Sequence, residues 1–172
     1  MAFLWLLAVA NAYAGPWSSS CIQPLLIGQT LGGGQLTTSD CYWYASNPSE
    51  RYYTDVYSFV GTAGQQISIA LSSTAFDTFV ELFKVNEISA SALAHDDNGG
   101  GGTNSRIPAG SGMFTLSATG TYYIWAESIA TNATGAYTIA LDGMASAYAR
   151  TYVQKAYVSY YGRPADPAGH AY

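Results

Sequence analysis

The chain has 172 residues, of which 49% are hydrophobic and only 10% are charged. This length favours one domain with a short appendage, and the hydrophobic fraction is sufficient for a packed core. The formal net charge is −5 and the six Lys and Arg residues are scattered. Nucleic acid and anionic membrane surfaces are therefore disfavoured as partners, because phosphate binding needs clustered basic residues. Few charges with many Tyr and Gly residues are typical of an exported β-rich protein.

The N-terminus has the features of a secretion signal. Phe3 to Val9 is a short apolar run, and Ala12 and Ala14 flank Tyr13 at the spacing of a cleavage site. The run is too short to span a bilayer. No Lys or Arg precedes it, which is atypical, and the alternative interpretation is a buried first strand. We expect a signal peptide at 1–14.

Two cysteines, Cys21 and Cys41, lie close to the expected mature N-terminus. An isolated pair in an exported chain favours a disulfide. Neither cysteine has a Cys or His at the spacing of a zinc site. The alternative is two buried free thiols.

The region from 15 to 143 is predicted to be an antiparallel β-sandwich of seven or eight short strands joined by Gly-rich turns. A polar aromatic loop is expected from Tyr42 to Arg51, and a turn or bulge at the three glycines within 29–36. The expected strands cover the segments 24–27, 29–36, 52–60, 66–72, 76–85, 113–118, 121–127 and 136–143.

Alternation within two of these strands separates a core face from an outward face. Val80 and Leu82 are expected to face the core with Phe76, and Tyr122 is expected to share its face with Ile124 and Ala126. The outward aromatic residues form a candidate binding surface, because flat side chains suit sugar rings or peptides. An alternative is that a second sheet or the tail covers them. The members of this surface are Phe79, Phe83, Tyr123 and Trp125.

The pattern becomes helical in the segment 144–172. Apolar residues recur at spacings of three and four, and Gly162 followed by Pro164 suits a helix end. Such a helix must pack on the sandwich, on a partner, or on residues outside this sequence. The apolar positions are Tyr148, Tyr152, Val153, Ala156 and Tyr160.

Residues 21–142 resemble a bacterial pre-peptidase C-terminal domain. The matching pieces include YYTDVYSFVGTAGQQISIAL, FDTFVELF, HDDNGGGGTNSRI and TGTYYIWAES, in this order. The resemblance implies a non-catalytic, jelly-roll-like β-sandwich appended to exported proteases and other exported proteins. It also implies that calcium binding, substrate binding, or assistance in secretion and maturation is to be expected.

The tail resembles the start of a small helical bacterial domain of unknown function, marked by a helix followed by GRPADPAG. Only the opening of that domain is present. We therefore expect the chain to be a fragment of a longer exported protein, with the tail helix docking on a neighbouring domain or subunit.

The glycine-rich segment 96–105 is the candidate metal site. Carboxylates, amide oxygens and inward carbonyls are the ligands that calcium prefers, and glycine allows the tight backbone that such a site needs. The segment lacks the spacing of an EF-hand, so the site would be irregular. The alternative is a long polar turn between two strands. The expected ligands are Asp96, Asp97, Asn98 and Asn104, with Asp77 from the preceding strand.

Enzyme motifs are not found: there is no G-x-S-x-G elbow, H-E-x-x-H helix or P-loop. His95 beside Asp96 lacks the fixed geometry of a catalytic base, and a glycosidase pair drawn from Asp77, Glu81 and Asp97 has no evident means of raising one pKa. We expect a secreted, calcium-stabilised accessory module that binds a polymer or protein partner or assists export of a fused or neighbouring enzyme. The alternative is a structural or assembly subunit of an extracellular or surface structure.

Overall fold

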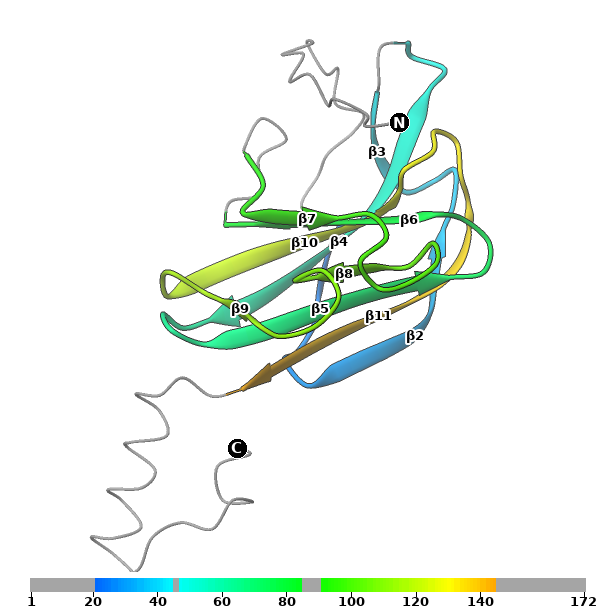
Figure 1. The fold of residues 1–172 in the computed structure, drawn as a ribbon. Helices are drawn as coiled ribbons and strands as arrows, with labels where there is room; N and C mark the ends of the chain where they lie inside the picture. The colour runs from blue at the N-terminus through cyan, green and yellow to red at the C-terminus, as the bar shows by residue number, and fades with distance from the viewer. Residues whose placement is uncertain (1–20, 45–46, 85–90, 145–172) are drawn as a thin grey trace, which may run out of the picture.

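The structure is a computed structural model, and it describes residues 21–44, 47–84 and 91–144 (Figure 1). The predicted signal peptide lies outside the described residues. The predicted tail helix does so as well, except for Met144, which is the last residue of a strand. No α-helix occurs among the described residues, and this part of the chain therefore holds no helix of a length and apolarity suited to crossing a membrane.

The described residues form eleven strands in two sheets. Sheet A has the order β1-β4-β10-β6-β7, with β3 also paired to β4, and sheet B has the order β2-β11-β5-β8, with β9 paired to β5. All pairs are antiparallel except β1 with β4. The strands of sheet A are β1 (Ile22–Pro24), β3 (Cys41–Tyr44), β4 (Arg51–Gly61), β6 (Thr78–Phe83), β7 (Ala94–Asp96) and β10 (Gly120–Ser128). Those of sheet B are β2 (Gln29–Leu36), β5 (Gln66–Ser73), β8 (Ser105–Ile107), β9 (Phe114–Thr115) and β11 (Gly135–Met144).

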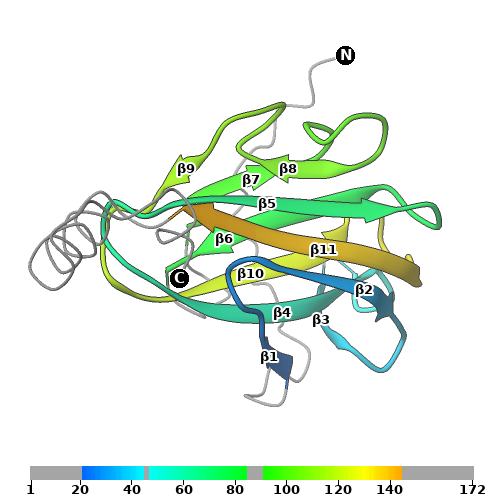
Figure 2. The same cartoon turned by 90° about the horizontal axis from the view of Figure 1, so that it is seen from below.

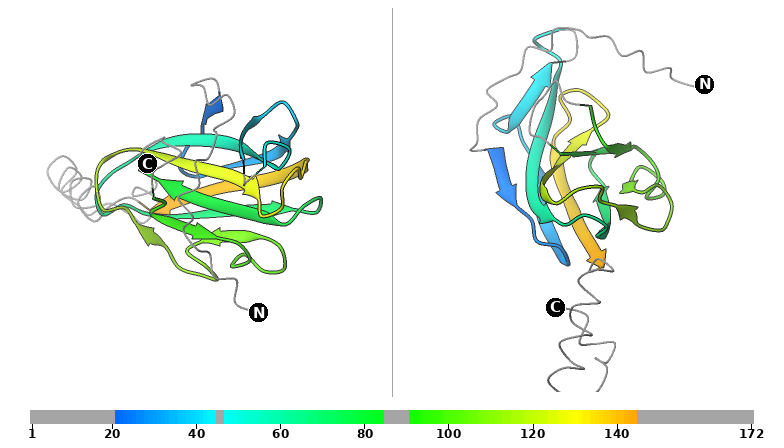
Figure 3. Two further views of the ribbon diagram at one scale, coloured as in Figure 1. Left: turned by 90° about the horizontal axis from the view of Figure 1, so that it is seen from above. Right: turned by 90° about the vertical axis from the view of Figure 1, so that its left-hand side faces the viewer.

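The two sheets stack in two layers around one core (Figure 3). Val80, Leu82, Tyr122 and Ile124 of sheet A are fully buried there, together with Ala126, as the alternation predicted. Sheet B contributes Ile67, Ile69, Leu71, Ile107, Tyr137, Ile139 and Leu141 to the same cluster. The all-β prediction is confirmed, and burial of these side chains supplies the main stabilisation, at about 1.5–3 kcal/mol for each large apolar side chain.

Two details of the strand prediction were wrong. The described residues form eleven strands rather than seven or eight, because β3, β7 and β8, of only three or four residues each, were not among the expected segments. The segment expected to be an aromatic loop begins with β3, which pairs with the start of β4. Cross-strand aromatic contacts stabilise this pair: the rings of Trp43 and Tyr52 are stacked with centroids 4.2 Å apart.

The three glycines in β2 form a bulge opposite β11, which is one of the two predicted alternatives. The register shifts between Tyr137 and Thr138, and Gly33 has a φ of 81°, which favours glycine. A Cβ on Gly34 would lie 2.5 Å from the ring of Tyr137. The bulge therefore lets this ring enter the core close to the backbone of β2.

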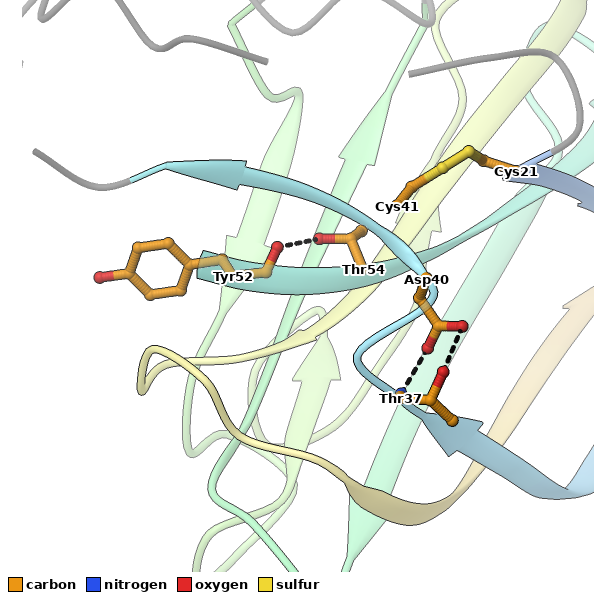
Figure 4. The surroundings of a disulfide bond; sticks show 6 residues. All are labelled: Cys21, Thr37, Asp40, Cys41, Tyr52 and Thr54. Carbon is orange, nitrogen blue, oxygen red and sulfur yellow. Dashed lines mark hydrogen bonds between the residues drawn. A yellow bond between two sulfur atoms is a disulfide. The ribbon is translucent and has the colours of Figure 1, made fainter. Parts of the chain in front are cut away.

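A disulfide joins Cys21 and Cys41, with Cα atoms 6.0 Å apart, and confirms the predicted pairing (Figure 4). It links the residue before β1 to the first residue of β3. Asp40 orders the turn that leads to this cysteine, because its carboxylate accepts hydrogen bonds from the backbone N–H and the hydroxyl of Thr37, at 2.5 and 2.9 Å. The bond closes a loop that contains the whole of β2.

Candidate metal centre

The segment 97–104 crosses between the sheets. It leaves β7, which pairs with β6 in sheet A, and enters β8, which pairs with β5 in sheet B. Both strands lie along the same side of the domain, at the top of Figure 2. The candidate site therefore lies at an edge of the sandwich, where the two layers are joined by polar loop residues.

Asp96 organises the loop. Its Oδ2 accepts hydrogen bonds from the backbone N–H groups of Gly99 and Arg106, both at 2.7 Å. A Cβ on Gly99 would lie 2.5 Å from Asp96 Oδ1 and 2.7 Å from the backbone of Ala109. The carboxylate thus holds the two ends of the loop together, in a space that only glycine leaves open.

The rest of the loop is a tight backbone turn. The N–H of Gly100 donates to the carbonyl of Asn104 at 2.8 Å, and the N–H of Asn104 donates to the carbonyl of Gly101 at 3.2 Å. Gly101 and Gly102 have φ values of 94° and 66°, a region that other residues rarely adopt. The consecutive glycines are therefore needed for the turn itself.

A buried hydroxyl pair anchors the loop to β6. The hydroxyls of Thr78 and Ser105 are 2.7 Å apart, and the Ser105 hydroxyl also lies 2.8 Å from the carbonyls of Thr78 and Asp97. The N–H of Ser105 donates to Thr78 Oγ1 at 2.9 Å. Sequence reasoning did not single out these two residues. The available signal was that Thr78 is polar yet in phase with Val80 and Leu82 on the core face.

Within the described part of the chain, two carboxylate oxygens are buried without a hydrogen-bond partner, Asp77 Oδ1 and Asp97 Oδ1. Burial raises the pKa of Asp97, and the neighbouring charges of Asp77 and Asp96 raise it further. The structure therefore brings Asp77 close enough to Asp97, twenty positions later in the sequence, for its charge to act beside that of the adjacent Asp96. A buried acceptor without a donor is unfavourable, and a cation is one group that would satisfy both oxygens.

The two asparagines predicted as calcium ligands, Asn98 and Asn104, make hydrogen bonds within the protein. Asn98 donates from Nδ2 to Asp97 Oδ2 at 2.8 Å, and Asn104 Oδ1 accepts from the backbone N–H of Ser73 at 3.1 Å. Among the residues that the structure describes, no group of three or more His, Cys, Asp or Glu side chains is arranged to hold a metal ion.

The predicted aromatic surface lies on the outer face of sheet A. Tyr123 is opposite Phe83 in the register of β10 and β6, and the rings of Phe83 and Trp125 are 4.5 Å apart. Both of these rings are only 3% exposed, in a small cluster with Val56, whereas Phe79 and Tyr123 are half-buried. Ile22 and Ala92 pack against this cluster. Its exposed part is therefore smaller than the sequence implied.

The fold and this loop define an all-β module with a disulfide and a polar loop at the sandwich edge. Residues 53–128 match the family model of the bacterial pre-peptidase C-terminal domain. The resemblance stated from the sequence is confirmed over that segment, which runs from the third residue of β4 to the end of β10 and includes the glycine loop. No curated protein matches the chain.

Three solved structures with a similar backbone path each share 16% sequence identity with the chain. One is the pre-peptidase C-terminal domain of a collagenase from Bacillus anthracis, with a TM-score of 0.49, covering 70% of this chain and 94% of that one. Another is PliG of Aeromonas hydrophila, a periplasmic inhibitor of g-type lysozyme, with a TM-score of 0.47 and coverage of 71% and 96%. PliG of Salmonella Typhimurium gives a TM-score of 0.41, with coverage again of 71% and 96%.

Proposed function

We propose that the protein is a non-catalytic, exported accessory module with a jelly-roll-like sandwich, which is stabilised by calcium and binds a polymer or protein partner. In this role it holds a fused or neighbouring enzyme against that partner or assists its export. The observation that carries the calcium proposal is the pair of buried, unpartnered oxygens of Asp77 and Asp97. The family match over 53–128 supports the accessory role, and the disulfide supports an oxidising compartment.

In this proposal Asp77 and Asp97 supply the charged ligands. Asp96 holds the loop in shape through its bonds to two backbone N–H groups, and its other oxygen adds charge beside the ion. Asn98, Asn104 and loop carbonyls supply neutral oxygens after a local adjustment of their present hydrogen bonds. Calcium accepts six to eight such oxygens in irregular geometry. When bound, the ion neutralises the carboxylates that now raise the pKa of Asp97.

The calcium proposal is tested by thermal unfolding in calcium and in chelator. The native chain is expected to melt higher in calcium, by linkage worth about 2.7 kcal/mol when the ion is at about a hundred times its dissociation constant. The double variant Asp77→Asn, Asp97→Asn should lose this shift. In chelator it should be at least as stable as the native chain, because two repelling charges are gone.

Asp142→Asn is the matched control, since Asp142 is exposed on β11 in the other sheet. It should keep the full calcium response. A native chain whose melting temperature is indifferent to millimolar calcium would show that the loop is only a structural turn.

The partner-binding proposal rests on the half-buried rings of Phe79 and Tyr123. Tyr123 packs against the buried Phe83 and Trp125, and Phe79 is diagonal to Trp125 in the register of β6 and β10. Pull-down on insoluble polysaccharide and on collagen, with Tyr123→Ala and Phe79→Ala as variants, tests it. Retention that both variants weaken is the expected result, without hydrolysis of either material. Concentration-dependent self-association without any retention would instead favour an assembly subunit.

A further inference from the structure

The two most exposed large apolar side chains among the described residues lie on one face of the domain. Leu26 and Val60 are each 71% exposed, whereas Leu25 and Phe59, their neighbours in the sequence, are buried in the core. Because side chains alternate along an extended chain, Leu26 and Val60 point away from the core, on the outer side of sheet A. Single exposed apolar residues are ordinary, but two at one place on a surface indicate an interaction site.

The register brings Leu26 to the end of β4 that carries Val60. β1 runs parallel to β4, and its last residue, Pro24, is paired with Ser58. The N–H of Leu25 continues this pairing, because it donates to the carbonyl of Ser58 at 3.0 Å. Leu26 and Val60 each lie two positions beyond that last pair. They therefore share one corner of sheet A, which we name the end patch.

The end patch continues into the apolar outer face of sheet A. Ile22 of β1 and Tyr123 of β10 are partly buried and pack against the small cluster that contains Val56. In the register, Ile22 is paired with Val56, four positions before Val60, and Tyr123 is opposite Ser58. An apolar stripe thus extends from the end patch along β4, over about 13 Å for four strand residues.

The described chain ends at the same side of the domain, where β4 turns into β5 (Figure 1). Met144, the last residue of β11, pairs with Gln66, the first residue of β5. A Cβ on Gly143 would lie 2.5 Å from the side chain of Ile27, which follows Leu26. The chain therefore leaves sheet B a few residues away from the end patch.

We propose that the end patch is the docking site of the tail segment 145–162 of the same chain, which binds it as a helix. This segment lies outside the described residues, and its apolar positions from Tyr148 to Tyr160 predict a helix that must bury one face. The three residues 145–147 span about 10 Å when extended, which equals the usual separation of two stacked sheets. Tyr148 therefore reaches the outer side of sheet A.

The lengths of the two surfaces also agree. A helix from Tyr148 to Tyr160 is about 20 Å long, which is enough to cover the end patch and the stripe beside it. Of the possible packing places for the tail helix, this one is on the sandwich itself. Such docking needs neither calcium nor an external partner.

Trypsin cleavage of the full chain tests the docking, because Arg150 and Lys155 lie in the tail segment but are not among its apolar positions. Cleavage of a docked segment requires its release, so the cleavage rate follows the population of released tail. Leu26→Ser combined with Val60→Ser should raise the cleavage rate at Arg150 and Lys155 by about tenfold or more. This double variant should fold normally, since both side chains are exposed.

Leu93→Ser is the matched control. Leu93 is also an exposed apolar residue, at 43%, but it lies beside β7, at the edge of sheet A opposite to β1. This variant should leave the cleavage rate of the tail unchanged. Equal rates in the native chain and in the double variant would overturn the proposal, as would acceleration by Leu93→Ser. Protection that increases with protein concentration would place the tail on a second copy of the chain and would also overturn it.

Discussion

The hydroxyl of Tyr137 makes two hydrogen bonds in the core, and a substitution that removes only this oxygen atom tests both of them. It donates to Asp55 Oδ2 at 2.5 Å and lies 2.6 Å from the hydroxyl of Tyr57, inside the core. Since the proton of Tyr137 goes to Asp55, Tyr57 must donate to Tyr137. These two hydrogen bonds connect β4 of sheet A with β11 of sheet B. Tyr137→Phe removes both bonds and leaves the ring in place.

The cost of Tyr137→Phe should depend on pH. Burial raises the pKa of Asp55 to about 6, against the hydrogen bond from Tyr137, which lowers it. Losing that bond moves the pKa higher, so the variant loses stability relative to the native chain as pH rises through about 6. We expect a loss of about 3 kcal/mol at pH 8, from one bond to a charged acceptor and one neutral bond. At pH 5, below the pKa of Asp55, this carboxyl group is mostly protonated and both hydrogen bonds join uncharged groups. The variant should then lose about 1–2 kcal/mol.

Denaturant unfolding at the two pH values measures this difference. Tyr57→Phe is the matched control, because it removes only the neutral bond and leaves Asp55 with its donor. It should cost about 1 kcal/mol at either pH. Equal losses for Tyr137→Phe at pH 5 and pH 8, or a loss no larger than that of Tyr57→Phe, would refute the assigned direction of the hydrogen bonds.

Two further predictions concern the covalent link and the β2 bulge. Replacing both Cys21 and Cys41 by Ser should cost roughly 3 kcal/mol, from the entropy of a loop of this length, and two reactive thiols in the denatured, exported chain would contradict the native bond. Gly34→Ala should cost about 1–3 kcal/mol, because its Cβ would meet the Tyr137 ring at 2.5 Å, whereas Gly32→Ala, with nothing within 4 Å, should be close to neutral in the same unfolding assay.

The sequence alone was sufficient for the all-β class, the core faces and the disulfide. Alternation with a period of two is a local property of a strand, so Val80, Leu82, Tyr122 and Ile124 could be assigned to the core without knowing their neighbours. The pairing of Cys21 with Cys41 needed only a count of two cysteines and an exported setting. The family resemblance rested on the order of the motifs, which can also be read from the sequence alone.

Only the tertiary structure decided which side chains meet across strands. Asp77 approaches Asp97 and Tyr137 approaches Asp55 because of sheet order and register, which depend on contacts between distant segments. The same holds for Phe83 and Trp125, which face outward by alternation yet are buried by packing with Val56. A period-two pattern tells which way a side chain points, but what lies there is set by the packing of the whole chain.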